Sequence, residues 1–221
     1  MDEERFLKQK AKIDWLNVGD SNSAYFHQVV KTKKARNRID AVMDANGKVC
    51  DGDQVVSAFL NHYLNFLGQD GGVVALDTHD LFVNGLSSEQ ALEMIKPVSG
   101  EEIKQAMFSM GDDKSPGPDG FSACFFKHAW DIIGKDVILA IQDFFASGKL
   151  LKELNHTIIS LIPKVDTPSR INDFRPISLC NVLFKCITNI IANRLKDSLD
   201  QLVGVKQLAF VPERRISDNI L

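Results

Sequence analysis

The sequence predicts an α+β protein that is mostly helical and carries a small antiparallel sheet. Apolar residues recur every three or four positions through most of the 221 residues, which is the spacing of one face of a helix. Two short runs rich in β-branched residues, 157–162 and 174–179, are typical of strands joined by an irregular hairpin tip. A composition of 44% apolar and 25% charged residues is ordinary for a globular protein and excludes wholesale disorder, collagen and a coiled coil.

Two helices are expected in the first forty residues. Charged and apolar residues over 3–15 have the pattern of an amphipathic helix. After a turn at 17–20, Asp20 or Ser21 can cap a second helix. That helix is expected to end in a basic cluster formed by Lys31, Lys33, Lys34, Arg36 and Arg38.

A hairpin and a third helix follow. Alternation around Asn46-Gly47 favours a hairpin, because Asn-Gly accepts the positive φ values of a type I′ turn. Asp53 is expected to cap a helix over 54–67, with Gly68 as its C-terminal stop. Residues 1–68 are therefore expected to form an N-terminal helical region with a short hairpin.

The next residues predict a domain boundary. Residues 69–87 lack a periodic pattern and contain Gly71-Gly72, so they are the best linker candidate in the chain. Two short helices are expected to start at Ser87 or Ser88 and at Ser99, the second with Glu102 placed for a capping box. Residues 88–221 are expected to form the second domain.

The second domain has the strongest patterning. A loop rich in glycine and proline, 111–120, precedes a helix whose apolar residues run from Ile132 to Phe145 and which ends at Ser147-Gly148. The two strand-like runs come next. A long helix over 182–203 follows them, with its apolar residues on one stripe.

Charge is segregated along the chain. The net charge of -3 combines +3 over 1–40, -7 over 41–110, -2 over 111–151 and +3 over 152–221. Because a polyanion is attracted to local patches, this net charge does not exclude nucleic acid as a partner. No apolar run has the roughly 18 residues of a membrane span, and four cysteines in a chain this long indicate reduced thiols. With a start too charged for a secretory signal, the sequence predicts an intracellular protein, nuclear or cytoplasmic, with no membrane partner.

Lys164 and Arg175 flank the expected hairpin tip. Hairpin geometry can bring the two charged ends to one side, where an arginine fork and a lysine point charge would together hold phosphate oxygens. The alternative is a solvated hairpin decorated with charges. Spacing alone leaves both interpretations open.

The loop 114–120 is expected to be stiff and exposed. Its two prolines restrict φ, and its glycines are available for positive φ. The loop lacks the spacing of a Walker motif, so nucleotide hydrolysis is not indicated. It is either a binding loop or a tight connection between helices.

Several motifs then occur in one order, and together they are specific. They are the loop 114–121, the runs 160–164, 173–181 and 192–195, and the segment 207–212 followed by Ser217-Asp218-Asn219. This order resembles the reverse transcriptase of LINE-type (non-LTR) retrotransposons, especially the branch abundant in plants. The segment 15–27 resembles the stretch that joins the endonuclease to the polymerase in such elements.

The resemblance implies the fingers part of a right-hand polymerase fold. Lys164 and Arg175 would then hold the triphosphate of the incoming dNTP, and the chain would bind an RNA template and a DNA primer. The template-binding residues implied are Lys114, Ser115, Gly117, Asp119, Gly120, Gln207 and Phe210. Relatives hold Mg²⁺ on palm aspartates that would follow Leu221, so no catalytic residue, metal site or bound cofactor is expected in this chain.

Other candidate sites are weaker. Asp112-Asp113 precedes the stiff loop and is expected to be a solvated turn rather than a catalytic pair. Cys180 and Cys186 lack the spacing of a zinc site. Glu213 stands where relatives usually have glycine, which suggests a decayed or truncated copy. The basic cluster that ends in Arg38 could contact nucleic-acid phosphates or be a plain solvated helix end.

The sequence thus predicts a truncated RNA-directed DNA polymerase of a non-LTR retrotransposon. A non-catalytic nucleic-acid-binding or interaction protein derived from such an element is the alternative, and a purely structural helical domain is a third possibility. The oligomeric state is not predicted.

Overall fold

A computed structural model describes residues 23–69, 85–204, 207, 211 and 214. Within these ranges the predicted α+β class is confirmed, since helices dominate and the strands form two small antiparallel sheets. The chain divides into two compact units, one combining Met1–Gly72 with Ile159–Leu179 and the other combining Val73–Ile158 with Cys180–Leu221. The expected helix over 3–15 and most of the linker over 69–87 lie outside the described residues, so the predicted domain boundary stays a prediction.

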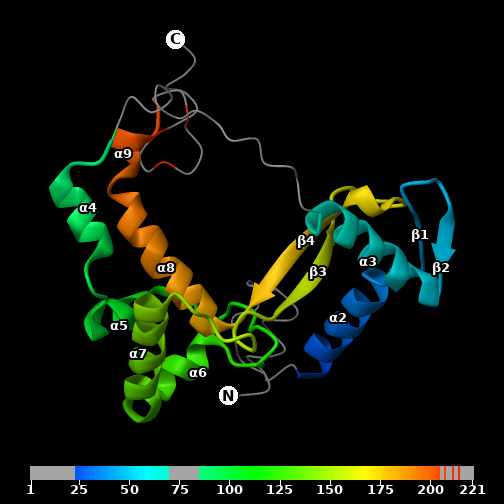
Figure 1. The fold of residues 1–221 in the computed structure, drawn as a ribbon. Helices are drawn as coiled ribbons and strands as arrows, with labels where there is room; N and C mark the ends of the chain where they lie inside the picture. Colours follow the sequence, from blue (N-terminus) through cyan, green and yellow to red (C-terminus); the bar gives the residue numbers. More distant parts are fainter. Residues whose placement is uncertain (1–22, 70–84, 205–206, 208–210, 212–213, 215–221) are drawn as a thin grey trace. The chain divides into compact units, whose positions relative to one another are not determined.

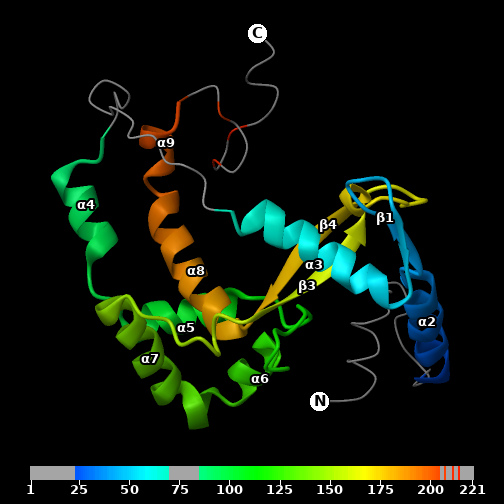
Figure 2. The same cartoon turned by 45° about the vertical axis from the view of Figure 1, so that its right-hand side comes forward.

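The first unit contains α2 (Ser23–Arg36), β1 (Ala41–Met43), β2 (Val49–Asp51) and α3 (Asp53–Leu67). It also contains most of β3 (Thr157–Pro163) and β4 (Phe174–Cys180), which the short 3-10 helix η1 (Ile171–Asp173) separates. Figure 2 shows α3 beside β3 and β4. The core of this unit contains Phe59, whose ring meets the ring of Phe174 edge-on at 5.4 Å. The other buried members are Val42, Cys50, Val55 and Ile171.

The hairpin predicted around Asn46-Gly47 is present, with Val42 opposite Cys50. Its turn differs from the prediction. Asp44 accepts a hydrogen bond from Gly47 N–H and donates its own N–H to the carbonyl of Lys48, which defines a three-residue loop with Gly47 at φ 82°. Such a loop is the type I turn with a following left-handed glycine, in place of the two-residue type I′ turn.

The second unit is a helical assembly (Figure 1). Its helices are α4 (Ser88–Ile95), α5 (Gly100–Ser109), α6 (Ala123–His128), α7 (Trp130–Ser147), α8 (Val182–Lys196) and α9 (Leu199–Leu202). The core lies among α5, α6, α7 and α8, where Ile103, Met107, Ile141 and Ile190 are almost completely buried. These residues are the apolar stripes that the sequence pattern predicted, packed against one another.

Three helix ends differ from the sequence prediction. Gly52, not Asp53, is the N-cap residue of α3, and no side chain caps that end. Ser99 Oγ accepts the N–H of Glu102, but the reciprocal bond of a capping box is absent there, because the Glu102 carboxylate is bound by Arg194. A complete capping box is present at the start of α4, between Ser87 and Gln90. The long helix expected over 182–203 is interrupted between α8 and α9.

No helix in the described ranges combines the length and the hydropathy of a transmembrane span. All four cysteines are free thiols. Cys186 lies in the core of the second unit, with its Sγ 3.7 Å from the carbonyl oxygen of Ile103. Burial raises the pKa of this thiol to about 12.

Cys186 is expected to resist alkylation in the folded protein. The thiolate is the nucleophile, and a raised pKa together with burial removes both the reactive form and access to it. Treatment with iodoacetamide near pH 8 should modify the half-buried Cys124 and Cys180 first and Cys186 only after unfolding, as read by peptide mass spectrometry. Equal labelling rates for Cys186 and Cys124 in the folded state would contradict the burial of Cys186.

Candidate functional site

The β3–β4 hairpin places the two predicted phosphate-binding cations. Both strands have seven residues. Their pairing register follows from one contact just past the tip and one contact at the other ends of the strands. The N–H of Lys164 donates to the Asp173 carbonyl at 2.7 Å, and Thr157 Oγ1 lies 3.5 Å from Cys180 Sγ. In this register Arg175 is diagonal to Lys164 on the same face, at a separation of roughly 7–8 Å for such pairs.

The two cations differ in their present contacts. The Lys164 ammonium donates to the carbonyl of Asn172 at 2.7 Å, so it points toward η1 at the tip. Arg175 is exposed, and its guanidinium binds no residue in the described part of the chain. The Arg175 guanidinium is therefore available to an anion. The Lys164 ammonium becomes available when it leaves the exposed carbonyl of Asn172.

Asp173 shapes the hairpin tip. Its carboxylate accepts the N–H groups of Arg170 (2.8 Å) and Ser169 (3.0 Å). These hydrogen bonds, with the charges of Arg170 and Lys164 as smaller causes, hold the pKa of Asp173 below its usual value. The carboxylate is therefore ionised near neutral pH. Sequence reasoning missed this role, in which an acidic residue at the third position of η1 reaches back to the N-cap N–H, as in a capping box.

The predicted stiff loop is anchored by a residue that the sequence did not single out. Asn181, only 2% exposed, precedes α8 and accepts the N–H of Asp119 at 3.3 Å. The Asn181 amide also donates to the carbonyls of Glu153 (3.1 Å) and Leu154 (3.3 Å). One buried amide thus joins the loop, the segment before β3 and the start of α8.

Further bonds hold the same loop. Lys185 of α8 donates to the carbonyl of Ser115 at 2.9 Å. Asp119 accepts the N–H of Phe121 at 3.0 Å, and Gly120 has φ 76°. Gly117 packs so closely on Asn181 that there is no room for a Cβ. Lys114 remains exposed, and so do Ser115 and the Asp119 side chain.

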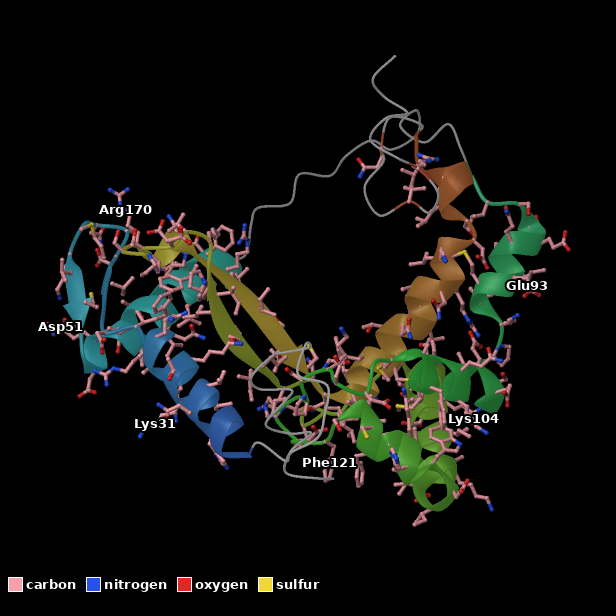
Figure 3. The ribbon with its side chains drawn as sticks, turned by 180° about the vertical axis from the view of Figure 1, so that it is seen from behind. Lys31, Asp51, Glu93, Lys104, Phe121 and Arg170 are labelled. Atoms are coloured by element: carbon pink, nitrogen blue, oxygen red, sulfur yellow. The ribbon has the colours of Figure 1, made fainter. Side chains whose placement is uncertain are left out.

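The basic cluster lies on α2 and the turn after it. Lys31, Lys34 and Arg36 are exposed and Lys33 is half-buried, and Figure 3 shows Lys31 projecting from the helix. Arg38 forms an ion pair with Asp40, so part of its charge is neutralised. This geometry is compatible with a phosphate contact and with a solvated helix end alike.

The remaining predicted positions are only partly described. Gln207 is exposed, and Arg214 donates to its carbonyl and to those of Val203 and Gly204. Phe210 lies outside the described residues. Asp112 and Asp113 are exposed in a turn, and the carboxylate of Asp112 binds the ammonium of Lys127 at 2.7 Å.

No protein-family model matches the chain. Over 215 residues, 96% of its length, the chain is 29% identical to the "Transposon TX1 uncharacterized 149 kDa protein" of Xenopus laevis. Over 135 residues, 61% of its length, it is 27% identical to the "Retrovirus-related Pol polyprotein from type-2 retrotransposable element R2DM" of Drosophila melanogaster. The chain spans 16% and 12% of these two proteins. It is therefore related to proteins of transposable elements.

Proposed function

We propose that this chain is the fingers part of an RNA-directed DNA polymerase of a non-LTR retrotransposon, in a right-hand polymerase fold. In the full-length protein it binds the RNA template, the DNA primer and the incoming dNTP. The observation that carries the proposal is the placement of Lys164 and Arg175 on one face of the β3–β4 hairpin, with the Arg175 guanidinium exposed. The similarity to a retrotransposable-element Pol polyprotein supports it.

The chemistry of the two side chains suits a triphosphate. The Arg175 guanidinium offers a planar fork that matches two phosphate oxygens, and the Lys164 ammonium adds a point charge. Exchanging the exposed Asn172 carbonyl for a phosphate oxygen replaces a bond to a neutral acceptor with a charge-assisted one. Both cations would neutralise charge that develops on the leaving pyrophosphate.

The loop 114–120 would guide the template strand in this proposal. Its anchoring by Asn181 and Lys185 holds its backbone in one conformation, which lowers the entropy cost of ordering a binding surface. Among the residues that the structure describes, no three acidic, histidine or cysteine side chains gather to hold a metal ion. In the full-length enzyme, palm aspartates would hold the Mg²⁺ ions, and two such ions would promote phosphoryl transfer.

Nucleotide affinity tests the proposal. Arg175→Ala and Lys164→Ala should each weaken dNTP binding by about tenfold, the loss typical of one charge-assisted hydrogen bond. Arg175→Lys should recover only part of the loss, because lysine lacks the fork. Isothermal titration with dNTP, and with inorganic triphosphate as competitor, measures these affinities. Lys135→Ala on the exposed surface of α7 is the matched control and should bind as the wild type does.

The same measurements distinguish the polymerase function from a second candidate function. A non-catalytic nucleic-acid-binding protein is favoured by the exposed cations of α2, whose last turn carries Lys33, Lys34 and Arg36. For such a protein the hairpin variants would bind dNTP no differently from the wild type. RNA affinity would instead fall steeply with salt and with charge removal on α2.

A further inference from the structure

A groove in the first unit lies on the side of α3 that faces the β1–β2 loop. Its volume is about 920 Å³, within the range of small-molecule and nucleotide sites. One wall is the polar side of α3, and the other is the loop from Asp44 to Lys48. Cys50, Ala58 and Ile171 of the unit's core line it as well, so the groove has an apolar base between polar walls. We call it the α3 groove.

Three carboxamides line the helix wall at helical spacing. Gln54, Asn61 and Asn65 are exposed, and none forms a side-chain hydrogen bond with another residue in the described part of the chain. A carboxamide presents a donor and an acceptor side by side, the pattern that matches the edge of a nucleobase. The row is thus equipped to bind a planar neutral heterocycle.

Two parallel aromatic rings stand at the same wall. The rings of His62 and Phe66 are 6.2 Å apart between centroids and only 5° from parallel, and Phe66 is 74% exposed. An apolar ring that solvent reaches on a protein surface is a stacking platform, and base–aromatic stacking tolerates every base. The amides and the rings therefore point to the same class of ligand.

The opposite wall is held rigidly. Asp44 accepts the N–H groups of Asn46 and Lys48, both at 2.9 Å. Met43 donates its N–H to the carbonyl of Ser169 at 2.8 Å, which ties the loop to the β3–β4 tip. Figure 3 shows Arg170 at this junction. A second cavity of about 390 Å³ at Arg170 shares Asp44, Asn46 and His62 with the α3 groove.

We propose that the α3 groove binds the bases of a single-stranded nucleic acid. Of the described residues that line the α3 groove, Lys48 is the one lysine or arginine, against the carboxylates of Asp44 and Asp53. This balance disfavours a triphosphate and favours neutral bases, while Lys48 and Arg170 at the loop side can meet the backbone. The inference goes beyond the proposed dNTP clamp, because it uses α3 and the β1–β2 loop and needs neither Lys164 nor Arg175.

The test uses the whole chain and labelled oligonucleotides of about twelve nucleotides, which is within the site sizes of proteins that bind single-stranded nucleic acid. Fluorescence anisotropy compares the wild type with Asn61→Ala/Asn65→Ala and His62→Ala/Phe66→Ala. Each double variant should bind single-stranded RNA on the order of tenfold more weakly. Leu64→Ala is the control, since Leu64 is 61% exposed on α3 but lines the other, apolar side of the helix.

An abasic oligonucleotide of equal length and charge supplies the decisive comparison. The abasic strand should bind weakly and with the same affinity to the wild type and both double variants, because it has no bases that could contact the groove. The proposal would be overturned if the double variants lost as much affinity for the abasic strand as for the RNA, or if they lost no affinity for the RNA. Single-stranded DNA in place of RNA shows which sugar the site accepts. Since Lys164→Ala and Arg175→Ala are assayed with dNTP, the clamp and the groove can fail independently.

Discussion

Gly117→Ala is expected to lower the free energy of unfolding of the second unit by about 3 kcal/mol, at the upper end for overpacking a core site. An added Cβ would overlap Oδ1 and the backbone N of Asn181 and lie 2.6 Å from its Cα. Two of these atoms are backbone at the start of α8, so no side-chain rotation can relieve the overlap. Either the loop 114–120 or the first turn of α8 must move.

Chemical denaturation followed by circular dichroism measures this effect. Gly85→Ala is the matched control, because a Cβ there meets nothing within 4 Å and its φ is not positive. The control should change stability by less than about 0.5 kcal/mol, as a surface substitution does. Equal stability of Gly117→Ala and Gly85→Ala would show that the loop does not pack on Asn181.

Arg194→Met is expected to cost about 3–5 kcal/mol, the range for breaking a buried ion pair by removing one partner. The Arg194 side chain is 11% exposed and donates to both Glu102 carboxylate oxygens at 2.7 Å. It also donates to the carbonyls of Met94 (3.0 Å) and Lys96 (2.7 Å). Methionine fills similar space but leaves one half-buried carboxylate and two carbonyls without these donors.

A double-mutant cycle with Glu102→Gln isolates the pair. If Arg194 acts mainly through Glu102, the double variant should be less destabilised than the sum of the two single variants. Strict additivity would place the stabilisation elsewhere, in the bonds from Arg194 to the end of α4. Thermal and urea unfolding of the four proteins give the required free energies.

The ion pair also predicts a dependence on acid. The hydrogen bond from Arg194 holds the pKa of Glu102 below its ordinary 4.5, despite an opposing effect of partial burial. Because the pKa of the folded state is the lower one, the pair stabilises the protein fully above pH 4.5. The stabilisation is lost as pH falls through the lowered folded pKa. The stability gap between the wild type and Arg194→Met should therefore narrow in acid, and a gap independent of pH would contradict this assignment.

The sequence by itself determined the local elements. Periodicity predicted α3, α7 and α8, β-branched runs predicted β3 and β4, and Gly148 ends α7 with φ 67° as a glycine stop should. It also placed Lys164 and Arg175 at the two strand ends that flank one hairpin tip. All these signals lie within a few residues of the structure they specify, which is why they are visible without a fold.

Tertiary structure determined which residues far apart in the sequence contact one another. Asn181 meets Asp119 across 62 positions, and Arg194 meets Glu102 across 92. The second of these contacts engages the Glu102 carboxylate, so the capping box predicted at Ser99 lacks its reciprocal bond. The α3 groove likewise depends on how α3 packs against the β1–β2 loop and Ile171. Periodicity shows which face of a helix is buried but not what covers it, because that choice depends on how all apolar faces pack together at once.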